Sequence, residues 1–541
     1  MLINNILPKI WMRFAQMLRQ LIRQCHFPSI PSAALIGFGT LFLLIWWLSM
    51  GFSSGNNLLI VNQTFTIKPS NLIVSPTDAK VSLQSKNEHL AAAFGSLWPK
   101  LSQLNCNSLL TNGMKFKQFS GGKWRRILQK DPPHGHLDTN CTAIRARWHF
   151  VETAGTAREA NFPLAFARTV FRPWYKIFII IFIPSKKCHP QIVHDFLLLE
   201  QMLSVEYTPQ NVYCYALDAK ADALFMRRVH ALARCFPNVV VLAEQFSVFS
   251  NGKNVTRAQL ACLEAMLPMG KWKYALLLQA KKNNFLRKSF WKFFNHDLPL
   301  RTNAELVEIL RVYKGTNDIG TKKIVPNTVN LSLDWSLASL HIYREGHRVP
   351  MPTNLTRLHH TKSLNLIALS RSAVEFTLGT LRLDKMIAQL ELSAYGMDEV
   401  LFSTLNSNLP DFPGGFSPIC LPRRPVPNMG RYTIWHGNGV ATASGGCRSA
   451  FFRHGVCVYG TEDLWHIARD RLHFYLNKMM PSFDFGAIFC WLNALTARRD
   501  GQRRTKKNAV PLLKVNRRFY AELPHVGALQ PPPVLGSSGG V

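Results

Sequence analysis

The chain has 541 residues, of which 47% are hydrophobic, and its formal net charge is +33. This apolar content excludes a wholly disordered chain, and the length allows one large domain or two to three ordinary ones. The charge taken alone predicts a polyanionic partner, such as nucleic acid, a membrane surface or a sulphated glycan, so the topology of the chain has to be considered first.

The first predicted element is a transmembrane helix over residues 33–52, a stretch without any charge. Twenty residues at about 1.5 Å each match a hydrocarbon layer of roughly 30 Å. Lys9 and three arginines precede this stretch, and the first charge after it is Lys68. The positive-inside rule therefore predicts a cytoplasmic tail over residues 1–32 and a lumenal remainder. A cleaved signal peptide is the alternative, but the leading region is long and the apolar stretch exceeds a typical signal core.

Residues 53–100 are polar and predict a lumenal stem, because Ser, Asn and Pro are scattered among a few apolar clusters. Ten of the eleven cysteines follow the apolar stretch, and an oxidising lumen would pair most of them. No C-x-x-C pair occurs, so a zinc ribbon is not supported. Five N-glycosylation triplets also fit a lumenal address, each weak alone, at Asn62, Asn140, Asn254, Asn330 and Asn354.

Residues 101–497 have a globular pattern in which strand and helix signals alternate. Strands are predicted over 211–218, 238–244 and 272–279, and helices over 219–235, 257–267 and 302–314, the last opened by a capping box. Such alternation predicts an α/β fold with a largely parallel sheet and helices on both faces. The basic segment 498–541 ends in Pro, Gly and Ser and is predicted to be disordered.

Ligands of such sheets bind beyond the carboxyl ends of the strands, where Asp218 follows a predicted strand. An isolated aspartate at this position is more often a turn or cap residue than a functional one. No Asp-x-Asp metal motif follows this strand, because Ala219 and Lys220 come next.

Several blocks of the globular region resemble, in order and spacing, the core-2/I-branching β-1,6-N-acetylglucosaminyltransferase family. They are NVYCYALDAK, ARCFPNVVVLAE, RAQLACLEAM, WKYALLLQ, HDLPLRTNAELVEIL, YGMDEVLFSTL and the segment 447–484. The resemblance implies a Rossmann-like GT-A glycosyltransferase domain in the Golgi lumen, behind a single-pass type II anchor. It also implies UDP-GlcNAc as donor, an O-glycan or glycoprotein as acceptor, β-1,6 branching, and no metal or other cofactor.

The resemblance assigns a role to several residues of this chain. Glu399 matches the general base of an inverting, single-displacement reaction, and Arg453 and Lys478 match the pair that binds the donor diphosphate. Asp218 matches a position near the nucleotide, and Trp435 matches an aromatic residue that packs against the acceptor sugar. Between Arg453 and Cys457 the chain has one residue more than the usual pattern.

Without the family context these residues also have plain structural readings. Asp398 and Glu399 are also typical of a helix start, where carboxylates are favoured by the helix dipole. Arg453 and Lys478 are also consistent with solvated surface charges.

By resemblance, eight cysteines form the pairs Cys106–Cys490, Cys141–Cys235, Cys214–Cys262 and Cys447–Cys457. Cys188 and Cys420 are then left over in the lumenal part, and a leftover cysteine predicts a possible disulfide-linked homodimer.

Two segments interrupt the resemblance, residues 169–191 and 280–294, and both are basic and aromatic. They are either loops that bind membranes or polyanions, or ordinary surface loops, or translated introns. We favour the third reading. These inserts and the basic tail supply much of the positive charge, which weakens the prediction of a nucleic-acid partner.

Three other functions stay open from the sequence. Peptide O-xylosyltransferases share the same domain type, so UDP-xylose is the alternative donor. A catalytically inactive relative that binds glycans is the second alternative, and a polyanion-binding membrane protein, predicted from charge alone, is the third.

Overall fold

The structure is a computed structural model, and it describes residues 104–111, 137–170, 194–249, 251–279, 297–324, 328–346, 356–393, 396–415, 427–436, 446–453, 455–469, 472–504 and 517–523. All of them belong to one of the two units into which the chain divides, the unit formed by residues 84–179 and 191–541. Within these ranges no helix is both long and apolar enough to cross a membrane. The predicted cytoplasmic tail, transmembrane helix and stem lie outside the described residues.

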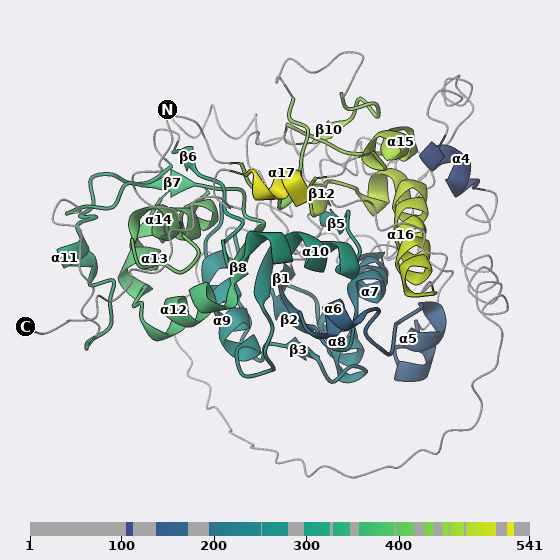
Figure 1. Cartoon of the computed structure of the whole chain (residues 1–541), viewed down its shortest axis with the longest axis horizontal. Coiled ribbons are helices and arrows are strands. Elements are labelled where there is room, and N and C mark those ends of the chain that lie inside the picture. The colour runs from purple at the N-terminus through teal and green to yellow at the C-terminus, as the bar shows by residue number, and fades with distance from the viewer. Residues whose placement is uncertain are drawn as a thin grey trace, which may run out of the picture. The chain divides into compact units, whose positions relative to one another are not determined.

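The central sheet has five strands in the order β3-β2-β1-β4-β8 (Figure 1). Its strands are β1 (Leu164–Val170), β2 (Val212–Leu217), β3 (Val239–Val241), β4 (Tyr274–Gln279) and β8 (Ile367–Ser370). The first four run parallel, and β8 pairs antiparallel with β4 at one edge. The largely parallel sheet predicted from strand-helix alternation is confirmed.

The helices that connect the strands follow the predicted ranges within a few residues. They are α8 (Ala223–Arg234), α9 (Val255–Met266) and α10 (Asn303–Tyr313). The capping box of α10 is present: the Thr302 hydroxyl accepts from the N–H of Glu305 at 3.3 Å, and the Glu305 carboxylate accepts from the N–H of Thr302 at 3.1 Å. Local capping chemistry therefore sets the start of this helix.

The two faces of the sheet have separate hydrophobic cores, because successive strand residues point to opposite faces. Phe166, Tyr213 and Leu276 pack on one face with α8, α10, α7 (His194–Glu206) and α16 (Pro481–Arg504). Ala165, Cys214 and Leu277 pack on the other face with α9, α12 (Arg371–Gly379) and α14 (Leu401–Asn408). The predicted helices on both faces are therefore confirmed.

Smaller sheets build the region beside the central sheet. Three strands in the order β5-β12-β9 form the first, namely β5 (Asp297–Pro299), β12 (Tyr475–Asn477) and β9 (Arg431–Tyr432). Two antiparallel pairs form the others, β6 (Lys322–Lys323) with β7 (Thr361–Lys362) and β10 (Phe452–Arg453) with β11 (Val456–Cys457). The other described helices are α4 (Cys106–Thr111), α5 (Cys141–Arg147), α6 (Ala157–Ala160), α11 (Leu337–Leu340), α13 (Asp384–Glu391), η4 (Met397–Glu399), η6 (Thr461–Asp463), α15 (Leu464–Ile467) and α17 (Arg517–Ala521).

Four disulfides cross-link these elements: Cys106–Cys490, Cys141–Cys235, Cys214–Cys262 and Cys447–Cys457. They are the four pairs that the resemblance implied. The first joins α4 to α16 across 384 residues of sequence, so it ties the two ends of the domain together. Cys188 and Cys420 lie outside the described residues, so the disulfide-linked homodimer stays a prediction.

The prediction that residues 498–541 are disordered is wrong for the parts of this segment that the structure describes, residues 498–504 and 517–523. Helix α16 continues to Arg504, and α17 contains the buried Tyr520. Arg498 forms an ion pair with Glu305 at 3.0 Å, and Arg499, only 4% exposed, donates to the carbonyl of Ser204 at 2.5 Å. The basic composition suggested a solvated segment, but partners distant in sequence bind these guanidinium groups.

The two predicted inserts fall mostly outside the described residues. The first two residues of the 169–191 segment, Thr169 and Val170, complete β1 and pair with Ala216 and Leu217 of β2. The strand therefore extends two residues beyond the point where the resemblance breaks.

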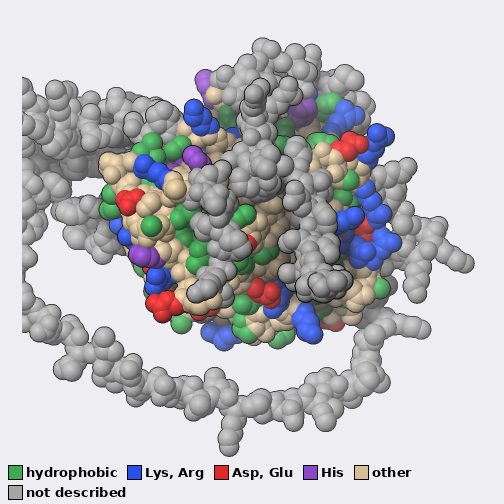
Figure 2. All heavy atoms as spheres, turned by 60° about the vertical axis from the view of Figure 1, so that its left-hand side comes forward, with side chains coloured by type: hydrophobic (Ala, Val, Ile, Leu, Met, Phe, Trp, Pro, Cys, Tyr) green, Lys and Arg blue, Asp and Glu red, His purple; other side chains and the backbone are tan. Residues whose placement is uncertain are grey.

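The described surface carries side chains of both charges: Figure 2 shows Lys and Arg side chains spread over one face, with Asp and Glu side chains among them.

Of the predicted glycosylation sites, Asn140 and Asn330 are exposed, whereas Asn62 and Asn354 lie outside the described residues. The side-chain nitrogen of Asn254, to which a glycan would be attached, donates to the carbonyl of Ser247 at 2.8 Å.

Candidate active site

Glu399 ends the 3-10 helix η4, which leads directly into α14. Gly396 opens this turn with a φ of 75°, and its N–H donates to the carbonyl of Asn251 at 2.7 Å. The Glu399 side chain is 10% exposed, and its Oε2 lies 3.0 Å from Nζ of Lys362 on β7. The acid does stand at a helix start, as the plain structural reading expects, and it also meets a cation on a neighbouring strand.

Asp398, the residue before Glu399, packs directly against Gly252. Gly252 has a φ of 104°, and a Cβ added there would collide with the Asp398 carboxylate and would lie 3.1 Å from its backbone nitrogen. Because Asp398 is buried, its carboxylate has little room to move away. A residue without a side chain is therefore required here to seat the Glu399 turn.

We expect Gly252→Ala to destabilise the domain more than Gly270→Ala. Both glycines have positive φ values, 104° and 125°, so the backbone cost of about 1–2 kcal/mol is shared. A Cβ at Gly270 meets nothing within 4 Å, whereas the one at Gly252 overpacks the Asp398 turn, which costs about 1–3 kcal/mol more. Denaturant midpoints of the two variants measure the difference, and equal midpoints would contradict this packing argument.

Lys478 follows strand β12 directly, and only 7% of the residue is exposed. Its ammonium group donates to the carbonyl oxygen of Arg453 at 3.2 Å. Burial, helped by the nearby charges of Arg453 and Arg431, lowers the pKa of Lys478 to about 8. Burial also lowers the pKa of Arg453. Two partly desolvated cations that lie near one another form a site at which an anionic group is stabilising.

Arg453 lies in a short antiparallel hairpin. Arg453 in β10 pairs with Val456 in β11, directly after Gly455. Gly455 has a φ of 73°, which a tight turn of this kind favours. Arg453 lies beside Lys478, although its segment has one residue more than the usual pattern.

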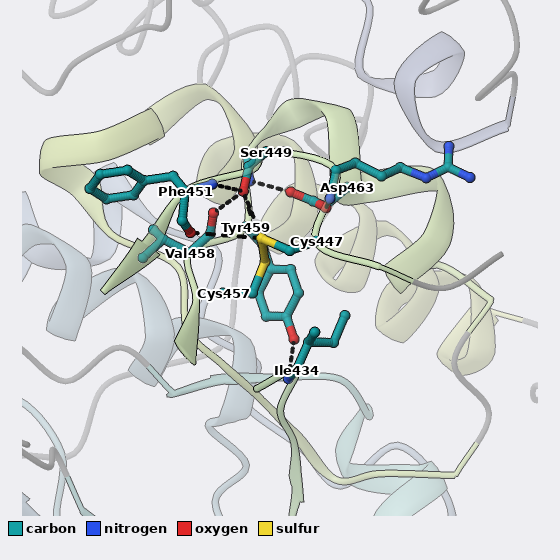
Figure 3. Close-up of a disulfide and its surroundings, with 10 residues drawn as sticks. Ile434, Cys447, Ser449, Phe451, Cys457, Val458, Tyr459 and Asp463 are labelled. Carbon is teal, nitrogen blue, oxygen red and sulfur yellow. Dashed lines mark hydrogen bonds between the residues drawn. A yellow bond between two sulfur atoms is a disulfide. The ribbon is translucent and has the colours of Figure 1, made fainter. Parts of the chain in front are cut away.

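The hairpin is fixed by the Cys447–Cys457 disulfide, which Figure 3 shows with its hydrogen bonds. Ser449 Oγ, inside the loop that the disulfide closes, donates at 2.6 Å to the carbonyl of Val458, the first residue after that loop. The next residue, Tyr459, donates its N–H to the carbonyl of Lys478 at 3.0 Å. The disulfide-bonded hairpin is therefore hydrogen-bonded to the segment that carries the buried lysine.

A chain of buried polar side chains leads away from the Glu399 turn. Asn365 Nδ2 donates to Asp398 Oδ2 at 3.5 Å, and Asn365 Oδ1 accepts from Arg431 Nη1 at 2.5 Å. Asn365, Arg431 and Asp398 are each less than 9% exposed. In such surroundings hydrogen bonds are strengthened by the low local dielectric, so this chain fixes the relative positions of its members.

The same chain continues to Lys478. Arg431 forms a buried ion pair with Asp297, and Asp297 Oδ1 accepts from Asn477 Nδ2 at 2.7 Å. Asn477 is the residue directly before Lys478. The residues that precede Glu399 and Lys478 are thus joined through three side chains only, Asn365, Arg431 and Asp297. The structure therefore links the segment of the predicted base to the segment of Lys478, and whether the side chains act in one site stays a prediction.

Asp218 lies at the carboxyl end of β2, as predicted, and is 2% exposed. Its Oδ1 lies 2.8 Å from Nζ of Lys220 and accepts from the N–H of Val248 at 3.3 Å. The loop 246–254 thereby contacts Asp218 at one end and the Glu399 turn, through Gly252, at the other. Asp218 also accepts from the N–H of Lys220 at 3.2 Å, a bond typical of a turn residue. The structural interpretation of this aspartate therefore holds beside the functional one.

Trp435 is 40% exposed and lies beside the hairpin of Arg453. It forms an isolated bridge with Val456, and its Cε3 lies 4.0 Å from the place where a Cβ on Gly455 would be. An exposed indole next to the candidate diphosphate site offers an apolar face to a sugar ring.

Sequence reasoning assigned no role to Lys362, Asp297, Asn365 or Arg431. Asp297 lies in one of the blocks that carry the resemblance, but 134 residues separate it from Arg431, and no local periodicity pairs such distant charges. In the part of the chain that the structure describes, no three His, Cys, Asp or Glu side chains group in a way that would hold a metal ion.

Named enzymes show similarity over most of this chain. A rat β-1,3-galactosyl-O-glycosyl-glycoprotein β-1,6-N-acetylglucosaminyltransferase 3 is 24% identical over 417 residues, covering 72% of this chain and 82% of the relative. A human N-acetyllactosaminide β-1,6-N-acetylglucosaminyl-transferase is 27% identical over 347 residues, covering 60% and 71%. A β-1,3-galactosyl-O-glycosyl-glycoprotein β-1,6-N-acetylglucosaminyltransferase of bovine herpesvirus 4 is 24% identical over 380 residues, covering 67% and 76%.

The family model described as Core-2/I-Branching enzyme matches residues 191–468, about half of the chain. This range contains Asp218, Glu399, Trp435 and Arg453, and it ends shortly before Lys478. The match and the three relatives agree with the blocks that carried the resemblance. The chain therefore belongs to the core-2/I-branching enzyme family of glycosyltransferases.

Proposed function

We propose that this protein transfers N-acetylglucosamine from UDP-GlcNAc to a sugar hydroxyl of an O-glycan and forms a β-1,6 branch. The observation that carries the proposal is the buried chain from Asp398 to Asn477, which joins the Glu399 turn to the cations Lys478 and Arg453. The donor and the branching reaction are those named for the relatives, and they come to this chain as a proposal.

In the proposed reaction the acceptor oxygen attacks the anomeric carbon of the donor sugar. The carboxylate of Glu399 takes the proton of the attacking hydroxyl, and the bond between the anomeric carbon and the diphosphate oxygen breaks. UDP leaves with the bonding electron pair, and Lys478 and Arg453 stabilise its negative charge. Attack opposite to the leaving group inverts the configuration at the anomeric carbon, which fits one base and no covalent intermediate.

Metal independence is part of the proposal. Its support is that the strand ending at Leu217 is followed by Asp218-Ala219-Lys220, without an Asp-x-Asp motif, and that Lys478 lies close enough to Arg453 to feel its charge. A guanidinium offers two parallel hydrogen bonds to a phosphate and an ammonium offers a point charge, so this pair supplies the charge that a metal ion would otherwise provide. For the acceptor side we propose that Trp435 packs against a sugar ring, and for the nucleotide side that Asp218 lies near the donor.

We further propose that the protein is a single-pass type II protein of the Golgi membrane, with its catalytic domain in the lumen. The charge-free stretch 33–52, preceded by four basic residues, supports the anchor. The four disulfides support an oxidising compartment, because such bonds form and persist in the secretory pathway.

The test uses the full-length protein in detergent, incubated with radiolabelled UDP-GlcNAc and a core-1 disaccharide, with and without EDTA. We expect transfer to position 6 of the acceptor in both conditions. A parallel incubation with UDP-xylose and a serine-containing peptide distinguishes the xylosyltransferase alternative. Transfer only from UDP-xylose would overturn the proposed donor, loss of transfer in EDTA would overturn metal independence, and no transfer from either donor would favour an inactive glycan-binding relative.

We expect the affinity for UDP to fall as the pH rises through about 8, the pKa to which burial lowers Lys478. Below this pH the side chain is a cation that attracts the diphosphate, and above it the neutral amine does not. If only the protonated form binds, the dissociation constant rises about tenfold per pH unit above that pKa. Lys478→Met is expected to bind UDP about 10- to 100-fold more weakly at pH 7, because a charged hydrogen bond is lost.

Isothermal titration calorimetry with UDP between pH 7 and 9.5 measures both effects. The affinity of Lys478→Met should be flat over this range, while Lys314→Met, which changes an exposed lysine, should follow the wild-type curve. The same slope in the wild type and in Lys478→Met would remove Lys478 from the donor site.

A further inference from the structure

Strand β7 is anchored on both sides of Lys362 to the segment that carries Glu399. On one side the Thr361 hydroxyl lies 2.9 Å from Ser403 Oγ and 3.1 Å from Ser407 Oγ, both on α14. The N–H of Thr361 also donates to Thr404 Oγ1 at 3.2 Å, and that hydroxyl donates back to the carbonyl of Thr361 at 3.3 Å. A short polar ladder thus fastens the strand to the helix that follows the candidate base.

On the other side Ser363 is bonded to Glu399 itself. Its N–H donates to the backbone carbonyl of Glu399 at 2.9 Å, and its hydroxyl accepts from the N–H of Gly320 at 2.9 Å. The Ser403 hydroxyl donates to the carbonyl of Gly320 at 2.9 Å, which closes a ring of contacts between the strand, the loop before β6 and α14. Residues 361 and 363 are both buried, so the backbone at residue 362 has little freedom to shift relative to Glu399.

Lys362, between these two anchors, extends its ammonium group to the Glu399 carboxylate. Its side chain is 27% exposed, in contrast to its buried neighbours, and Nζ lies 3.0 Å from Oε2 of Glu399. An ordinary surface ion pair contributes little, because both side chains lose conformational freedom when they pair. Here the backbone of both partners is already fixed, and the carboxylate is only 10% exposed, so the cation acts on it at short range and with reduced screening.

The other charges around Glu399 are arranged differently. Asp398 precedes it on the same turn, and its carboxylate is directed to Asn365 and Gly252. Helix α14, with the sequence LFSTLNSN, carries no charge. Strand β6 contributes Lys322 and Lys323, both exposed, and Lys322 pairs with Lys362 across the strands. Lys362 is thus a cation in direct contact with the candidate base.

We propose that Lys362 is a positioning residue that orients the Glu399 carboxylate and keeps it ionised in mildly acidic surroundings. The inference rests on the proposed function, in which Glu399 takes the proton of the acceptor hydroxyl. A cation within about 4–6 Å favours the ionised form of a carboxylate, so the base remains ready to accept a proton at lower pH than an isolated acid would.

The experiment measures kcat as a function of pH between 4.5 and 8 for the full-length protein and three variants. In Lys362→Met the acidic limb of the profile is expected to move to higher pH by about one unit, since the cation that favours the ionised base is gone. Lys362→Arg keeps the charge and is expected to restore the limb to within a few tenths of a unit. Lys323→Met removes one exposed lysine from the neighbouring strand and is expected to leave the profile unchanged.

Two measurements separate this inference from the proposed function. If the wild type transfers no sugar, or if Glu399→Gln retains transfer, the proposed function fails and this inference with it. If Glu399→Gln is inactive but Lys362→Met keeps the wild-type limb, or loses activity equally at every pH, Lys362 is only structural and the inference alone is overturned. Thermal midpoints of the variants check folding, and Lys362→Gln replaces Lys362→Met if the latter unfolds below the assay temperature.

Discussion

Replacement of Glu399 by glutamine is expected to lower kcat by about 10²- to 10⁴-fold, the usual contribution of a positioned general base. Glutamine has nearly the same shape, but its amide cannot take the proton of the acceptor hydroxyl. The proposal gives the donor diphosphate to Lys478 and Arg453, so the KM for UDP-GlcNAc should change little. Initial rates at saturating acceptor, measured over a range of donor concentrations, separate these two effects.

Glu375→Gln is the matched control for this substitution. Glu375 lies on α12, its side chain is 51% exposed, and it pairs with Arg371 one helical turn away. Loss of this surface charge should leave both kcat and KM at wild-type values. If Glu399→Gln keeps more than a tenth of the wild-type kcat, Glu399 is not the base and the proposed mechanism is wrong.

Removal of the Cys106–Cys490 disulfide, as Cys106→Ala with Cys490→Ala, is expected to give the largest loss of stability. The bond closes a loop with a sequence separation of 384, and in the chain-entropy account the stabilisation grows with the logarithm of loop length. The expected cost is about 5 kcal/mol in the free energy of unfolding, at the upper end of measured values. Urea midpoints under non-reducing conditions measure it.

The matched control removes the Cys447–Cys457 disulfide, whose sequence separation is 10. The same account predicts a cost about 3 kcal/mol smaller for this short loop. Activity should respond in the opposite order, because the short loop fixes the Arg453 hairpin beside Lys478 whereas the long one ties α4 to α16. Equal urea midpoints for the two double variants would contradict the loop-length argument.

The alternation of strands and helices in the central part of the fold could be predicted from local sequence patterns. The strand ending before Asp218, the helix after it and the capping box at Thr302 all lie within the predicted ranges, because hydrophobic period and caps are properties of neighbouring residues. The basic run at Arg498 and Arg499 was misread as a disordered tail for the same reason. Its partners, Glu305 and Ser204, lie far away in the sequence, and composition alone does not reveal them.

The site was predicted in part. Glu399, Arg453 and Lys478 came from blocks that resemble the family, and the structure joins their segments through Asn365, Arg431 and Asp297. The cationic partner of Glu399 was missed, because Lys362 sits in a two-residue strand without a motif of its own. The burial of the Lys478 amine was not predictable from the sequence either, because it depends on the residues that pack around the side chain.

The sequence by itself determined the order of the strands and helices, the family, and which eight cysteines can pair, since these follow from local periodicity and from blocks of residues in a fixed order. Only the tertiary structure decided that Arg431 meets Asp297 across 134 residues and that Lys362 contacts Glu399. It also decided that Lys478 is a cation with a pKa of about 8. The physical reason is that charge pairing and desolvation depend on which distant segments exclude water together, and local sequence does not specify that.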